Sequence, residues 1–216
     1  MARLKEYNGY YCESEYEYAF IGFLETEGWI YSSGNNISRV TKRDVLIADD
    51  FKKFIVDTNP DLTEDEVTQI FDNVRLVGSE SDFATLHKVY GWMVNGIQFT
   101  PQGGIARMIP LIDFKKDSNK NIFRVVNQFT VEYTNNGQKE NRRPDVLLFV
   151  NGMPLCVIEL KNPADANATI YDAWEQINIR YWRDIPHLLH YCTLACISDG
   201  VKTRLGTVHT PYEHFY

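Results

Sequence analysis

The chain has 216 residues, a length that accommodates one domain with a substantial hydrophobic core. Apolar residues make up 44% and charged residues 24% of the sequence, which is a globular composition and excludes a disordered chain. The formal net charge is −7, which argues against a general nucleic-acid binder, because such proteins are usually basic.

The sequence lacks the patterns of membrane insertion and of cysteine-based metal binding. No apolar run approaches the roughly 18 residues that a spanning helix needs, and the N-terminal residues lack the apolar core of a secretion signal. We therefore expect a cytoplasmic protein without membrane association. Cys12, Cys156, Cys192 and Cys196 form no Cys-x-x-Cys pair, so we expect free thiols.

Apolar side chains at intervals of three and four positions predict a first helix over residues 13–27, and Gly28 ends it. The side chains expected on its buried face are Tyr16, Ala19, Phe20, Phe23 and Leu24. We therefore expect this helix to pack on the rest of the domain through a largely aromatic face.

Three more helices are predicted over residues 44–57, 64–75 and 81–93. The start of the middle one is the best defined, because Thr63 and Glu66 have the spacing of a capping box. The N-terminal part, residues 1–95, is thus expected to be mainly helical.

After Gly96 the sequence takes on the composition of strands. IQFT, RMIPLID, FRVVNQFTVEY, DVLLFV and LCVIEL are rich in β-branched and aromatic residues and are separated by turn signals. A helix over 167–183 and a strand, LACIS, follow. This order predicts an α/β fold, a central mixed β-sheet flanked by helices. We expect one domain over 1–216, with residues 96–208 as its catalytic core.

The segment from Arg143 to Lys161 contains two apolar strands joined by Asn151-Gly152, a strong hairpin signal. Charged residues stand only at the open end of this hairpin. Glu159 and Lys161 are two positions apart on a strand, so their side chains share a face, roughly 6–7 Å apart.

Phosphodiester hydrolysis accounts for these charges. Asp145 and Glu159 can hold Mg²⁺ through carboxylate oxygens, and the metal can activate a water molecule. The Lys161 ammonium can stabilise developing charge or orient that water. A hairpin that simply ends in solvated charges is the alternative, because Asp…Glu-x-Lys alone is a weak pattern.

The register of the hairpin decides whether the two carboxylates can share a metal. A two-residue turn at Asn151-Gly152 would place Asp145 opposite Ile158, so that Asp145 and Glu159 faced opposite sides of the sheet. We therefore predict a three-residue loop or a β-bulge in this hairpin.

The words RPDVLLFVNGMPLCVIELKNP, ATIYDAWEQI, YWRDIP and ISDGVKTRLG resemble the N-terminal domain of the restriction (R) subunit of type I restriction-modification enzymes. That domain belongs to the PD-(D/E)xK nuclease superfamily, which implies a restriction-endonuclease-like core. The resemblance is dense over 123–208 and looser over ESEYEYAFIGFLETEGW, which is similar to the family's glutamate-bearing first helix. Residues 30–95 resemble the family poorly.

Carried over by position, the resemblance implies that Asp145 and Glu159 are metal ligands and that Lys161 is catalytic. The backbone carbonyl of Leu160 is a further ligand by the same comparison. On the first helix Glu17 matches the acidic position best, with Glu13 next.

The family also has a Gln-x-x-x-Tyr motif on the helix that follows the lysine. Here Gln176 and Tyr181 are separated by four residues instead of three, which rotates them apart by about 140° on a regular helix. Either Tyr181 is displaced from its role in the family, or the helix contains a π-bulge.

The function implied is a Mg²⁺-dependent endonuclease domain that cleaves double-stranded DNA beside modification and specificity subunits. ATP would bind only the translocase motor of a full-length subunit, because this sequence has no phosphate-loop motif, and we expect the chain to be a fragment of that subunit. A non-catalytic DNA-binding or coupling module of the same fold is one alternative. A repair nuclease of the superfamily is another.

Arg142 and Arg143 precede the hairpin and allow two interpretations. They are placed to touch a DNA phosphate, but a solvated loop end fits them equally well.

Overall fold

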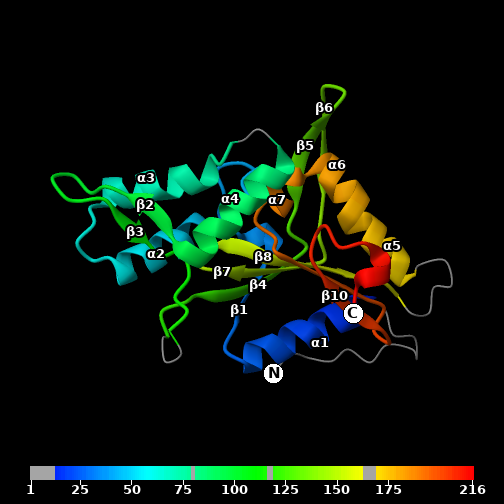
Figure 1. Cartoon of the computed structure of the whole chain (residues 1–216). Helices are drawn as coiled ribbons and strands as arrows, with labels where there is room; N and C mark the ends of the chain where they lie inside the picture. The colour runs from blue at the N-terminus through cyan, green and yellow to red at the C-terminus, as the bar shows by residue number, and fades with distance from the viewer. Residues whose placement is uncertain (1–12, 79–80, 116–118, 163–168) are drawn as a thin grey trace.

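The computed structural model describes residues 13–78, 81–115, 119–162 and 169–216 (Figure 1). At its centre is a six-stranded sheet in the order β1-β4-β7-β8-β9-β10. The strands are β1 (Ile30–Ser33), β4 (Phe123–Asn127), β7 (Val146–Val150), β8 (Met153–Leu160), β9 (Leu194–Ser198) and β10 (Thr203–Gly206). β1 is parallel to β4 and β8 is parallel to β9, whereas the other neighbours are antiparallel. The predicted mixed sheet is confirmed.

Helices cover both faces of this sheet (Figure 1). One face packs against α1 (Glu13–Thr26), and the other packs against the remaining helices. These are α2 (Ala48–Thr58), α3 (Glu64–Arg75), α4 (Asp82–Asn95), α5 (Ile170–Glu175) and α7 (Pro186–Leu189). A π-helix, Gln176–Tyr181, and α6 (Trp182–Asp184) continue directly from α5. The sheet therefore lies between two helical layers, each with its own hydrophobic cluster.

The first helix presents a face to the sheet that only partly matches the one predicted. Leu24 is buried and Phe20 packs against the same cluster, as predicted, whereas Phe23 is 59% exposed and Ala19 is also exposed. Phe23 and Ala19 were wrong because the sheet covers the stripe that includes Ile21, which the aromatic spacing alone did not favour. Glu17 lies on the same buried stripe, one helical turn before Ile21.

The capping box of α3 is confirmed. The Thr63 hydroxyl accepts a hydrogen bond from the Glu66 amide, and the Glu66 carboxylate accepts one from the Thr63 amide. The helix predicted over 44–57 begins only at Ala48, because residues 45–47 are extended and buried in the core.

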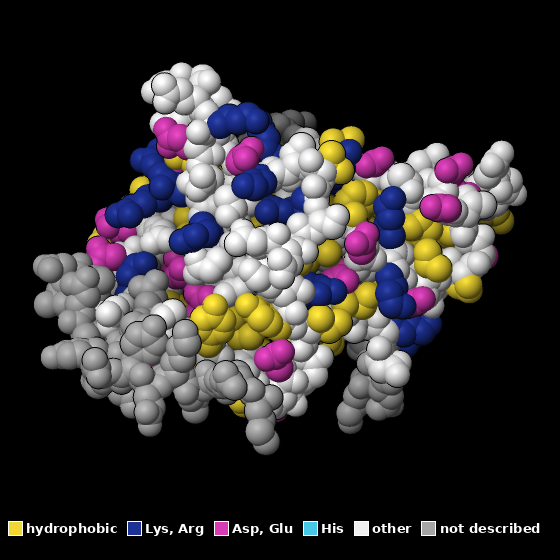
Figure 2. Space-filling view, turned by 180° about the vertical axis from the view of Figure 1, so that it is seen from behind, with side chains coloured by type: hydrophobic (Ala, Val, Ile, Leu, Met, Phe, Trp, Pro, Cys, Tyr) yellow, Lys and Arg dark blue, Asp and Glu magenta, His cyan; other side chains and the backbone are white. Residues whose placement is uncertain are grey.

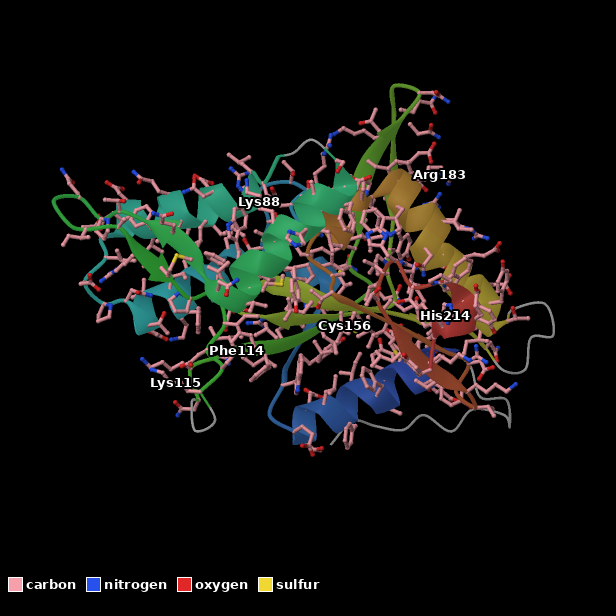
Figure 3. All side chains as sticks on the ribbon, in the orientation of Figure 1. Lys88, Phe114, Lys115, Cys156, Arg183 and His214 are labelled. Atoms are coloured by element: carbon pink, nitrogen blue, oxygen red, sulfur yellow. The ribbon has the colours of Figure 1, made fainter. Side chains whose placement is uncertain are left out.

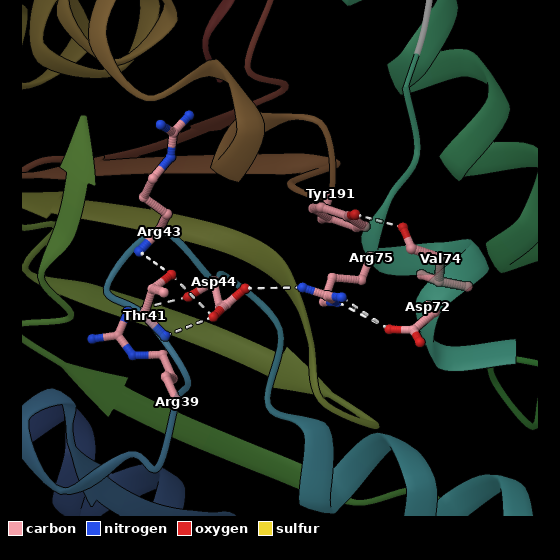
Figure 4. Close-up of polar contacts among 8 residues, drawn as sticks. All are labelled: Arg39, Thr41, Arg43, Asp44, Asp72, Val74, Arg75 and Tyr191. Carbon is pink, nitrogen blue, oxygen red and sulfur yellow. Dashed lines mark hydrogen bonds and ion pairs between the residues drawn. The ribbon is translucent and has the colours of Figure 1, made fainter. Parts of the chain in front are cut away.

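Polar contacts attach the segment before α2 both to the chain that follows β4 and to α3 (Figure 4). Arg39 donates to the carbonyls of Asp44 and Thr130, and its guanidinium lies 3.9 Å from the centre of the Phe129 ring. Asp44 also forms an ion pair with Arg75 of α3, at 3.6 Å. These contacts hold the helical layer on the sheet.

Several short strands were not predicted as separate elements. The run predicted as one strand over 123–133 divides into β4 and β5 (Val131–Asn135), because Gln128 adopts a positive φ of 54° between them. β5 pairs with β6 (Gln138–Arg142) in a hairpin that projects from the body (Figure 1). β2 (Ile97–Phe99) and β3 (Arg107–Ile109) form a second small sheet. β1, β6 and β10 were not predicted, because they are short and largely polar.

The β7–β8 hairpin contains the predicted bulge. Val146 lies opposite Ile158 and Leu148 opposite Cys156, but Phe149 then lies opposite Pro154. The shift adds one residue to β8 between the turn and the open end. One step beyond the Val146–Ile158 pair, the register places Asp145 opposite Glu159.

Cys156, Cys192 and Cys196 are free thiols, as predicted, whereas Cys12 lies outside the described residues. Cys156 stands in the middle of the sheet (Figure 3). Within the described ranges, no helix combines the length and the apolar character needed to cross a membrane.

Gly152 and Gly137 occupy equivalent turns and offer a matched test of the hairpin packing. Both have positive φ, 77° and 79°, but a Cβ on Gly152 would lie 2.2 Å from the Ile47 carbonyl oxygen, whereas one on Gly137 would meet nothing within 4 Å. We expect Gly137→Ala to lower the free energy of unfolding by about 1 kcal/mol. Gly152→Ala should cost about 1–3 kcal/mol more, because the backbone of α2 must move. Urea unfolding of both variants measures the difference, and equal losses would contradict the close packing of this turn on α2.

Candidate active site

Asp145 and Glu159 lie side by side at the open end of the β7–β8 hairpin. Asp145 is 8% exposed and Glu159 is fully buried. Asp145 Oδ2 accepts a hydrogen bond of 2.9 Å from the backbone amide of Leu160, which fixes its carboxylate beside β8. The two carboxyl groups are also close enough to share a hydrogen bond. The bulge thus produces the pairing on which the sequence-based hypothesis depended.

The buried Glu159 carboxylate is held by two side chains of the π-helix. Gln176 Nε2 donates to Glu159 Oε2 at 2.6 Å, and the Tyr181 hydroxyl donates to Oε1 at 2.6 Å. Gln176 Nε2 also lies 2.9 Å from the Tyr181 hydroxyl. Both oxygens of Glu159 therefore have fixed partners although no solvent reaches them.

The π-helix resolves the unusual Gln–Tyr spacing. On a regular α-helix, five positions would rotate these side chains apart, but the wider π turn brings them onto one face. The predicted π-bulge is present, and Tyr181 is not displaced from Gln176. The extra residue between them is absorbed by the backbone.

The Lys161 side chain joins Glu159 and its partners through a contact with Gln176. Its Nζ donates to Gln176 Oε1 at 3.0 Å, so the Gln176 amide bridges the lysine and the Glu159 carboxylate. Leu160 lies between Glu159 and Lys161 on the strand and packs in the cluster under α1. The alternation along β8 therefore puts the two charged side chains on the face opposite α1.

Burial and the neighbouring charge make Glu159 difficult to ionise. Desolvation raises the pKa of Glu159 well above its usual range, and the adjacent Asp145 carboxylate raises it further. The hydrogen bond from Tyr181 and the charge of Lys161 act in the opposite direction without offsetting the burial. In the absence of a cation, these effects favour the protonated form of Glu159.

Glu17 reaches the site from α1 through two amide side chains. Asn127 Nδ2 donates to Glu17 Oε1 at 2.6 Å, and Gln128 Nε2 donates to Oε2 at 2.7 Å. Gln128 Nε2 also lies 3.5 Å from Asp145 Oδ1 and so connects the two acids. The side chain of Glu13 lies outside the described residues.

The sequence analysis assigned no role to Asn127 and Gln128. Their signal was a polar pair that interrupts the apolar run FRVVNQFTV, but nothing in the spacing connected that pair to Glu17. Only the tertiary packing of α1 beside the end of β4 brings these residues together.

A metal ion at this site would depend on Asp145 and Glu159. Within the described parts of the chain, no group of three or more His, Cys, Asp or Glu side chains is spaced to hold a metal. Mg²⁺ does not require such a cage, because it commonly binds one or two carboxylates and keeps several waters. Two adjacent carboxylates, one of which burial makes difficult to ionise, fit a divalent cation, which would supply the positive charge that the ionised pair lacks.

Comparison with known proteins shows the family to which this chain is similar. The family model described as type I restriction enzyme R protein N terminus matches residues 10–214. The chain belongs to this family.

Two relatives illustrate the match. The chain is 34% identical over 210 residues, 93% of its length, to a protein of Methanocaldococcus jannaschii named as the type I restriction enzyme MjaIXP endonuclease subunit. It is 30% identical over 217 residues, 94% of its length, to the type I restriction enzyme HindI endonuclease subunit of Haemophilus influenzae. The matched part makes up 20% of each relative, so the chain spans about a fifth of their length.

The raised pKa of Glu159 predicts how the metal-free protein responds to pH. The folded state holds the Glu159 proton more tightly than the unfolded state does, so this residue's contribution to stability is lost as pH rises through its folded-state pKa. We expect Glu159→Gln to flatten the dependence of the melting temperature on pH above about 4.5, the ordinary pKa of a glutamate. Thermal unfolding in EDTA at several pH values measures this, with Asp57→Asn on exposed α2 as the control. Identical pH profiles for wild type and Glu159→Gln would show that Glu159 ionises normally.

Proposed function

We propose that this chain is a magnesium-dependent endonuclease domain that hydrolyses DNA phosphodiester bonds. The observation that carries the proposal is the fully buried Glu159 carboxylate paired with Asp145, with the Lys161 ammonium bridged to it through Gln176. Membership of the R protein family supports it, since the related proteins are named endonuclease subunits.

Asp145, Glu159 and the Leu160 carbonyl are the proposed metal ligands. A bound Mg²⁺ would supply Lewis-acid activation of the scissile phosphate and of a water molecule. Gln176 and Tyr181 keep the Glu159 carboxylate in a single orientation. Glu17 is a candidate further ligand, although both of its oxygens already accept hydrogen bonds, from Asn127 and Gln128.

Lys161 is the proposed catalytic cation. Because Gln176 Oε1 accepts its hydrogen bond, the partly buried ammonium is directed towards the carboxylate pair. From there it can stabilise the charge that develops on the phosphate or orient the attacking water.

The relatives are about five times as long as this chain. We propose that the chain acts, as part of a longer subunit, on double-stranded DNA together with modification and specificity subunits, and that an ATP-driven translocase motor is linked to it. ATP would then be required by the assembly and not by the site at Asp145 and Glu159.

A non-catalytic DNA-binding or coupling module of the same fold is the second candidate. The net charge of −7 favours it, because an acidic chain repels DNA unless cations are concentrated locally. The hydrogen-bonded arrangement around Glu159 and Lys161 favours catalysis instead. A repair nuclease is the weaker alternative, given the match to the restriction family.

Plasmid cleavage by the complete enzyme with ATP and Mg²⁺ separates these candidates. We expect Lys161→Ala to slow cleavage by about 10²–10³-fold, the usual cost of removing one transition-state stabiliser. Asp145→Ala should slow cleavage at least as much, because it removes a metal ligand. Lys53→Ala, an exposed change on α2, should cleave normally. Normal cleavage by both site variants would rule out the catalytic assignment.

The partners of Glu159 make a separate prediction about metal binding. Tyr181→Phe and Gln176→Ala each leave one carboxylate oxygen without its donor, so we expect the affinity for Mn²⁺ to fall about 10–100-fold. Calorimetric titration of the 216-residue chain measures this. Tyr171→Phe, an exposed tyrosine on α5, is the matched control. Unaltered Mn²⁺ affinity in both site variants would mean that the metal does not bind at Glu159.

A further inference from the structure

A polar cavity of about 500 Å³ lies next to the carboxylate pair. It is lined by Asn141, Arg142, Arg143, Gln176, Arg180 and Tyr181. Gln176 and Tyr181 are the two side chains that bind Glu159, so the cavity and the site share a wall. Its volume lies within the range of about 300–1,000 Å³ that is typical of ligand sites.

The arginines at and near this cavity differ in whether they form ion pairs within the protein. Arg142 forms an ion pair of 2.6 Å with Asp184, and its guanidinium lies 5.6 Å from the centre of the Tyr133 ring. Arg183, which is on α6 (Figure 3) and does not line the cavity, forms an ion pair with the same Asp184 at 2.7 Å. Arg142 and Arg183 therefore share one carboxylate within the protein.

Arg143 and Arg180 are exposed, and neither forms an ion pair with any residue in the described parts of the chain. Each of these arginines is close in the sequence to a residue of the candidate active site. Arg143 is two residues before Asp145, and Arg180 is immediately before Tyr181 on the π-helix. Arg143 and Arg180 interact electrostatically with Glu17 and Asp172, respectively, without a direct ion pair, so both guanidinium groups are open to a ligand beside the carboxylate pair.

The shape of the molecule places these charges in an accessible position. Figure 2 shows several Lys and Arg side chains, with Asp and Glu side chains among them, below the β5–β6 hairpin, which projects at the top of the molecule. Arg142 ends β6, so the base of the hairpin leads directly to the cavity. An acidic chain therefore carries a local basic surface beside its candidate active site.

We propose that Arg143 and Arg180 bind a DNA backbone phosphate adjacent to the one that is cleaved, with the sugar–phosphate chain seated in this cavity. The inference rests on the proposed nuclease function. Guanidinium groups suit this task because they bind phosphate oxygens in a bidentate fashion. The two arginines position the substrate, and they take no part in activating the water.

Binding of a short duplex DNA to the 216-residue chain tests the inference without requiring cleavage. Fluorescence anisotropy in EDTA, at several salt concentrations, would compare wild type with Arg143→Gln, Arg180→Gln and the double variant. Lys53→Gln is the matched control, because its side chain is 64% exposed on α2 and the same charge is lost.

Each arginine variant should weaken binding about tenfold. The slope of log affinity against log salt should fall by about 0.9 for each lost phosphate contact. Lys53→Gln should bind as wild type does. An equal loss in Lys53→Gln, an unchanged slope in the double variant, or no measurable binding by wild type at low salt would overturn the inference.

The DNA-binding test of the phosphate site and the cleavage test of the nuclease function can fail independently. Loss of cleavage in Asp145→Ala together with normal DNA binding by both arginine variants would reject the phosphate site alone. Weak binding by the arginine variants, with normal cleavage in Asp145→Ala and Lys161→Ala, would reject the nuclease function instead.

Discussion

The burial of the Glu159 carboxylate is the constraint to which the rest of the site responds. A fully buried acid is costly unless its oxygens have partners, and β8 is an interior strand with no solvent to supply them. One irregular backbone feature, the π-helix, meets this need, whereas the other, the β-bulge, adds to the cost. The bulge in β8 sets Asp145 opposite Glu159, and the π-helix brings the Gln176 amide and the Tyr181 hydroxyl to its two oxygens.

The same arrangement also has an electrostatic cost. Burial and the adjacent Asp145 raise the cost of ionising Glu159, so the metal-free fold favours its protonated form where a bound cation would favour the ionised form. Glu17 extends this acidic region through Gln128, whose positive φ of 54° also separates β4 from β5. The fold therefore gives up stability at the place where the proposed function needs charge, as expected of a catalytic centre.

Local spacing in the sequence was enough to predict much of the site. Counting from the Asn151-Gly152 turn showed that Asp145 and Glu159 could meet only through an irregularity, and the bulge is present. The Gln176–Tyr181 interval allowed either a displaced tyrosine or a widened helix, and the structure has the widened helix. The roles of Asn127 and Gln128 were not predictable, because they depend on where α1 lies against the end of β4. The buried face of α1 was partly wrong for a related reason, since the sheet and not the helix decides which stripe is covered.

The location of a bound divalent ion tests the central claim most directly. A crystal structure of the chain with Mn²⁺, with the ion identified by its anomalous scattering, should show it about 2.0–2.6 Å from oxygens of both Asp145 and Glu159. The hydrogen bonds from Gln176 and Tyr181 to Glu159 should remain in that structure. An ion bound elsewhere at saturating Mn²⁺, with the two carboxyl groups still sharing a hydrogen bond, would contradict the account.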